Sequence, residues 1–208
     1  MTSFEGVYGP FTITADDERE VLGYRLALFS AAIAQAALLL QWHQLGGSWI
    51  WPWLLPLLVG VGLALRWIHI YLRPLHQALQ LFWLLGCAGF VALAVQVGPG
   101  GMAEAVAGNG RWIWLIGPLF AALAGIGFKE FFCFRRPEAI GVTLLLPVAL
   151  LGHLSGLLPQ GACGALMGLE AALLLVLCLR KFPMPAAADV GDKSVFAYLE
   201  AQRQSPSP

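Results

Sequence analysis

The segment of the sequence with the densest polar chemistry is the ten-residue stretch 129–138, which lies between two strongly apolar stretches. It holds three bases, two acids and one thiol, interleaved with three phenylalanines. Guanidinium groups hold anionic groups through charge-assisted hydrogen bonds, so the segment predicts a docking or anion-binding site at a membrane interface. Alternatively, the bases anchor the chain at the interface and the phenylalanines act as interfacial wedges. The candidate residues are Lys129, Glu130, Cys133, Arg135, Arg136 and Glu138.

A second polar group occupies the connection near residues 66–76. Arg66 and Arg73 would extend the same anion-binding face. His69 and His76 are candidate ligands of a tetrapyrrole, because paired imidazoles bind haem iron. Pro74 interrupts the chain between them, and the alternative is that each histidine bonds to a loop carbonyl or a lipid phosphate. No cofactor is predicted apart from this alternative, and zinc-ligand spacing is absent.

Glu170 lies in the middle of an apolar stretch that is long enough to cross a membrane. A bare carboxylate there is costly, so it should be protonated, paired, or directed into a wet cavity. Its side chain either handles a proton or ligand, or is a neutral structural carboxyl bonded to a neighbouring helix. The other intramembrane polar candidates, which could bond to it, are Gln35, Gln80 and His153.

Glycines recur at helical spacing in two apolar stretches. Gly161, Gly164 and Gly168 include a G-x-x-x-G motif, and Gly86 and Gly89 form a similar pair. Small residues of this kind let helices approach closely, so both groups predict close helix packing within one bundle, with packing between chains as the alternative.

Composition excludes an ordinary soluble domain. Apolar residues make up 59% of the 208 residues and charged residues 12%, against about 25% charged in globular domains. No basic stripe suited to nucleic acid exists outside short loops. The sequence also has no P-loop, G-x-S-x-G, H-E-x-x-H or Rossmann fingerprint, which argues against the common enzyme classes and leaves a membrane enzyme open.

Six apolar stretches approach the length of about 20 residues at which a helix crosses a bilayer. They predict an all-α fold, a polytopic bundle of six transmembrane helices over residues 20–181. A polar N-terminal segment, 1–19, precedes the bundle, and a polar tail, 182–208, follows it. The predicted spans are 20–42, 50–71, 75–97, 112–128, 138–158 and 162–179.

Several local features follow from the same pattern. Thr14 is the expected N-cap of the first helix, and the fourth span is the shortest. The glycine-rich segment 98–110 is the longest predicted loop. Residues 193–204 predict a short amphipathic helix, and 205–208 a disordered end.

Charge placement fixes the expected orientation. Eleven of the 12 Lys and Arg residues map to one side of the six-span scheme, and Arg111 alone maps to the other. By the positive-inside bias, that side and both termini are cytoplasmic, or stromal in a plastid. Six tryptophans map to the opposite interface, as an aromatic belt would: Trp42, Trp49, Trp51, Trp53, Trp112 and Trp114.

Two motifs in the sequence carry a family resemblance. The first is Gly6-Val-Tyr-Gly-Pro-Phe-Thr-Ile-Thr14, followed by Asp17-Glu18 and Glu20-Val-Leu-Gly-Tyr-Arg25. The second is Phe128-Lys-Glu-Phe-Phe-Cys-Phe134 with Glu138. These motifs resemble an uncharacterised family of cyanobacterial and chloroplast integral membrane proteins. The resemblance implies the thylakoid or cytoplasmic membrane of an oxygenic phototroph and a role near the photosynthetic apparatus.

Three functional hypotheses remain. The leading one is a non-enzymatic protein that assembles or stabilises a larger membrane complex, with membrane lipids and subunits of that complex as its partners. The second is a small transporter or channel with Glu170 in a polar cavity. The third is a membrane protein that binds or acts on a lipid, quinone or tetrapyrrole.

Overall fold

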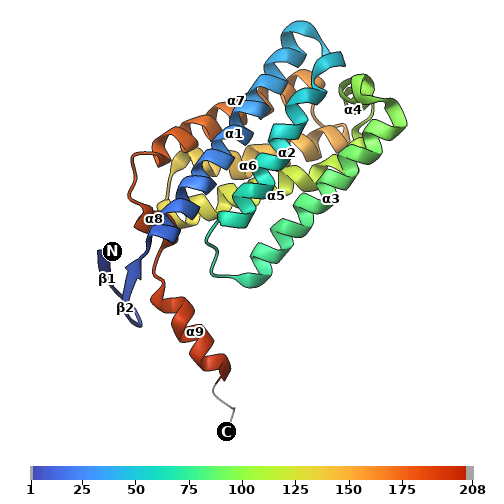
Figure 1. The fold of residues 1–208 in the computed structure, drawn as a ribbon. Helices are drawn as coiled ribbons and strands as arrows, with labels where there is room; N and C mark the ends of the chain where they lie inside the picture. Colours follow the sequence, from blue (N-terminus) through green and yellow to red (C-terminus); the bar gives the residue numbers. More distant parts are fainter. Residues whose placement is uncertain (1, 205–208) are drawn as a thin grey trace.

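Long apolar helices run side by side in the computed structural model, which describes residues 2–204 (Figure 1). Within these residues, five helices are long and apolar enough to cross a membrane, and a sixth apolar helix is shorter. The predicted all-α polytopic fold is therefore confirmed. The helices are α1 (Ala15–Leu45), α2 (Trp51–Trp67), α3 (Arg73–Val97), α5 (Ile113–Phe134), α6 (Pro137–Ser155) and α7 (Gln160–Lys181).

The helices pack in an order that differs from their order in the chain. α1 lies between α2 and α7, α6 lies between α7 and α5, and α3 packs on the far side of α5. A continuous buried core joins them, with Leu28, Leu93, Leu119 and Leu174 among its fully buried side chains. Both ends of the described chain lie at the same end of the bundle (Figure 1).

The second and fourth spans differ from their predicted lengths. α2 ends at Trp67, because Ile68 takes extended backbone and is buried in the core instead of continuing the helix. α2 is about 26 Å long at 1.5 Å per residue, which makes it the shortest of the six. α5 continues to Phe134, so residues 129–134 are helical and not a loop; their charges find buried partners and therefore do not end the helix.

Prolines open two of the helices. Arg73-Pro74 begins α3 and Arg136-Pro137 begins α6, where the missing proline N–H costs no hydrogen bond. Arg135, between α5 and α6, has a φ of 50°, the left-handed conformation that ends a helix.

The predicted long loop holds ordered structure. It forms α4 (Met102–Gly108), flanked by the short 3-10 helices η2 (Pro99–Gly101) and η3 (Gly110–Trp112). Met102 and Ala103 are buried against the bundle, so apolar contact overrides the glycine-rich composition. At the same end, the short 3-10 helix η1 (Gly47–Trp49) joins α1 to α2.

The two polar ends of the chain are also folded. Strands β1 (Thr2–Gly6) and β2 (Gly9–Ile13) form an antiparallel hairpin in which Phe4 stacks on Phe11. Thr14 caps α1 as expected, through a reciprocal capping box with Asp17. The tail contains an unpredicted helix, α8 (Ala186–Val190), and the expected one, α9 (Ser194–Gln204). The predicted disorder of 205–208 falls outside the described residues.

Candidate functional site

A cluster of buried charges joins α1, α5, α7 and α8. Its centre is Glu130 of α5, which is fully buried. One carboxylate oxygen accepts a hydrogen bond from Lys181 Nζ at 2.5 Å, and the other accepts from Tyr24 Oη at 2.6 Å. Lys129 Nζ approaches the same carboxylate at 3.3 Å. The charges are thus paired and hydrogen-bonded, as buried charges must be.

Asp189 of α8 extends the cluster into the tail. Its carboxylate accepts from Arg25 Nε at 2.8 Å and from Arg25 Nη2 at 2.6 Å, and it also pairs with Lys181. Arg25 donates in addition to the backbone oxygens of Met184 and Pro185. Burial alone would raise the pKa of Asp189, but the positive charge of Lys181 and the bonds from Lys181 and Arg25 hold that pKa below its ordinary value. The cluster therefore fastens the tail to the bundle.

This arrangement corrects the predicted docking loop. Lys129 is 6% exposed, Glu130 is 0% exposed and Glu138 is 4% exposed, so none of the three can present its charge to a partner. Glu138 faces Arg180, with a closest contact of 3.2 Å, and Arg136 at 3.7 Å. Of the residues predicted within 129–138, only Cys133 and Arg135 are exposed. The functional residues that sequence reasoning missed are Arg25, Lys181 and Asp189, since nothing local shows that the tail folds back on α1.

The two histidines of the second polar group contact different partners. His76 Nε2 lies 2.6 Å from the backbone oxygen of Leu65, and His69 lies 3.5 Å from a carboxylate oxygen of Glu20. Each histidine thus has a partner of its own, and no group of three or more metal-ligating side chains occurs among residues 2–204. Arg66 and Arg73 are exposed.

Glu170 finds one of its three candidate partners. Gln35 of α1 donates through Nε2 to Glu170 Oε2. Gln80 instead bonds to His76, and His153 bonds to the backbone oxygen of Val106. The four side chains therefore do not line a common polar cavity, as the transporter hypothesis required.

The contact between Glu170 and Gln35 leaves one oxygen on each side chain without a partner, although both residues are buried. A single proton on Glu170 Oε1, donated to Gln35 Oε1, would satisfy both oxygens and close a two-bond pairing between acid and amide. A carboxylate would instead leave two acceptors unpaired in an apolar interior, which is costly. The geometry therefore favours a neutral, structural carboxyl.

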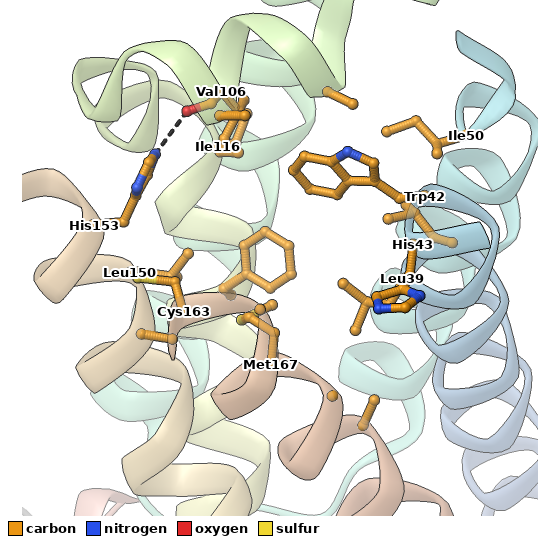
Figure 2. Close-up of a pocket in the computed structure, with 18 of the residues that line it drawn as sticks. Leu39, Trp42, His43, Ile50, Val106, Ile116, Leu150, His153, Cys163 and Met167 are labelled. Atoms are coloured by element: carbon orange, nitrogen blue, oxygen red, sulfur yellow. Dashed lines mark hydrogen bonds between the residues drawn. The ribbon is translucent and has the colours of Figure 1, made fainter. Parts of the chain in front are cut away.

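A pocket of about 910 Å³ lies between α1 and α7, with α4 along one side (Figure 2). Leu39 and Trp42 line it from α1, and Cys163 and Met167 line it from α7. Figure 2 shows the Trp42 side chain reaching into this space, with His153 on the far side bonded to Val106. The volume falls within the range of about 300–1,000 Å³ typical of small-molecule sites.

The glycines of α7 face this pocket and do not pack against another helix. A Cβ atom added at Gly161, Gly164 or Gly168 would meet no atom within 4 Å. The predicted packing of α7 within the bundle is therefore wrong, and packing between chains through these glycines stays a prediction. The predicted packing is right for α3, where a Cβ at Gly86 or Gly89 would overlap the backbone of α5.

Polar groups gather at one end of the pocket. The Trp42 indole, His43 and His153 lie near the ends of α1 and α6, and Gln160 begins α7. No Lys, Arg, Asp or Glu is among the lining residues that the structure describes. Deeper in the bundle the walls are apolar, with Phe90, Phe120 and Leu175.

Fold and site together define a polytopic helical membrane protein. Within that class, the chain belongs to the family described as uncharacterized integral membrane protein (DUF2301), which matches residues 63–198. No curated protein and no solved structure matches the chain. The predicted likeness to an uncharacterised membrane family is thus confirmed, while a cyanobacterial or chloroplast source stays a prediction. The matched range includes the motif at 128–134 and leaves the N-terminal motif outside it.

Proposed function

We propose that this protein is a non-enzymatic membrane protein that holds a lipid-like molecule in the pocket between α1 and α7. The observation that carries this proposal is the row of three α7 glycines that face open space. The pocket is open on one side, its walls are mostly apolar and the three glycines are exposed, so water in it would face apolar surface. In a membrane, an apolar molecule therefore fills it.

Larger side chains at the α7 glycines would fill the pocket and so test this proposal. Gly164→Leu and Gly168→Leu together place two side chains in the space, and Gly164→Ala with Gly168→Ala is the matched control of small volume. Lipids extracted from the purified proteins are compared by mass spectrometry. We expect a bound lipid-like species in the wild type and the alanine control and its loss from the leucine variant. Equal retention in all three proteins would overturn the proposal.

A second function, assembly or stabilisation of a larger membrane complex, is favoured by a module outside the bundle. The N-terminal hairpin and α9 project beyond the helix ends (Figure 1). Tyr8 stacks on Tyr198 with ring centroids 4.0 Å apart, and the backbone N–H of Val7 donates to Asp192 at 2.7 Å. This module supplies a partner-binding surface in place of the segment 129–138, in which Lys129, Glu130 and Glu138 are buried.

Replacing the stacked rings tests that surface without touching the bundle. We expect Tyr8→Ala with Tyr198→Ala to release partner subunits during purification in mild detergent, and Tyr8→Phe with Tyr198→Phe to retain them. Unchanged co-purification of the alanine variant would remove the idea. The proposed location is the thylakoid or cytoplasmic membrane of an oxygenic phototroph, supported by the N-terminal resemblance and testable by membrane fractionation.

A further inference from the structure

We infer that the occupant of the α1–α7 pocket is a neutral lipid whose head carries hydrogen-bond-accepting oxygens, of the carbonyl or quinone type. This inference rests on the proposed function and adds the chemical class of the ligand. It follows from the charge, the donors and the shape of the pocket.

The first reason is charge. Among the described lining residues there is no Lys or Arg to hold a phosphate or carboxylate head, and no Asp or Glu to hold an ammonium group. An unpaired charge in such surroundings is strongly disfavoured. Arg111, which lies in η3 beside α4, is exposed and does not line the pocket. The head is therefore uncharged.

The second reason is the unused donor. The Trp42 indole N–H makes no hydrogen bond within residues 2–204, and Figure 2 shows this ring extending into the pocket. An indole nitrogen can only donate, so its partner must be an acceptor oxygen. His153 Nε2 lies 2.7 Å from the backbone oxygen of Val106 and must donate to it, so Nδ1 of the neutral ring is an acceptor and the donor that faces the ligand head is Trp42.

The third reason is that the lining of the pocket changes from polar at one end to apolar along the rest of its length. Its polar groups lie at the end covered by α4, and its lining on α7 runs from Gln160 to Leu175, about 22 Å of helix at 1.5 Å per residue. A head at Trp42 would thus place an extended hydrocarbon chain beside Gly164 and Gly168, toward Leu175. An amphipathic molecule fits this gradient better than a compact apolar one.

The experiment compares three probes on the purified protein: decylubiquinone, which has a neutral carbonyl-bearing head; oleate, which is anionic; and dioleoyl phosphatidylglycerol. Affinities are measured for the wild type, Trp42→Phe, and Trp51→Phe, a control at an exposed tryptophan of the same interface. We expect decylubiquinone to bind most tightly. Trp42→Phe should weaken it between about twofold and tenfold, the worth of one neutral hydrogen bond, and Trp51→Phe should leave it unchanged.

The outcomes separate this inference from the proposed function. Tighter binding of oleate or phosphatidylglycerol, abolished in the Gly164→Leu and Gly168→Leu variant, would overturn the ligand class and leave the pocket intact as a lipid site. Equal binding of decylubiquinone to wild type and Trp42→Phe would overturn the placement of the head. Binding of every probe unaffected by the leucine substitutions would overturn the pocket itself.

Discussion

Replacing Asp189 by Asn tests whether the buried ion cluster fastens the tail to the bundle. The substitution keeps the shape of the side chain and one acceptor oxygen, but removes the negative charge that faces Arg25 and Lys181. The Arg25 side chain is 8% exposed and that of Lys181 1%, so water cannot replace the lost partner without opening the structure.

Breaking a buried ion pair by removing one member costs about 3–5 kcal/mol. Because Asn retains one acceptor, we expect a loss near the lower figure, about 3 kcal/mol, in the free energy of unfolding. Asp16→Asn is the matched control: Asp16 and Arg19 form an exposed pair whose side chains are 85% and 80% exposed. Exposed pairs of this kind are worth at most about 1 kcal/mol, so that variant should unfold like the wild type.

The assay is denaturant unfolding in detergent, combined with limited proteolysis of the connection between α7 and α8. Asp189→Asn should unfold at lower denaturant concentration and be cleaved faster after Lys181. A stability within 0.5 kcal/mol (about the error of exposed-site controls) of the wild type would refute the reasoning, because it would mean that the cluster is solvated.

The pH dependence follows from the direction of the pKa shift. The pKa of Asp189 is lowered from its ordinary value of 3.8, so its contribution is fully present above that value and is lost as the pH falls through the lower folded-state pKa. The stability difference between wild type and Asp189→Asn should therefore be constant from about pH 5 to 8. A difference that shrinks within that range would contradict the assigned charge state.

Three further substitutions test the bundle interior. Glu170→Gln should change stability by less than about 1 kcal/mol, because an amide preserves both bonds to Gln35, and it should remove one protonated-carboxyl band from the infrared spectrum; absence of that band in the wild type would contradict a neutral Glu170. Gly89→Ala should destabilise the protein by about 1–3 kcal/mol, because its Cβ would overlap the Leu115 backbone. Gly168→Ala should stabilise it by up to about 1 kcal/mol, since alanine favours helix and meets no atom; thermal unfolding checks both signs, and equal effects would show that α7 packs as closely as α3.

Hydropathy and charge were sufficient to predict the six long apolar helices, because each span must satisfy its own backbone and bury or solvate its own side chains. The Thr14 cap and the prolines at 74 and 137 were equally local signals. The helical state of Lys129 and Glu130 was not predictable in this way, since Glu130 is held by Tyr24 and Lys181, which are distant in the chain, and Lys129 pairs with Glu130.

The candidate site was less accessible to sequence reasoning for the same reason. The glycines of α7 have the spacing of a packing motif, and only the positions of α1 and α4 show that they face a hollow. Glu170 was recognised from its position in an apolar stretch, and Gln35 was among its expected partners. Choosing Gln35 over Gln80 and His153 required the order in which α1, α3, α6 and α7 pack.

An electron cryo-microscopy map of the protein in lipid nanodiscs tests most directly whether a lipid-like molecule fills the pocket. We expect elongated density in the pocket, with one end beside Trp42 and its length along Gly161, Gly164 and Gly168. Direct contact between α1 and α7 along those glycines, with no density between the two helices, would contradict this expectation.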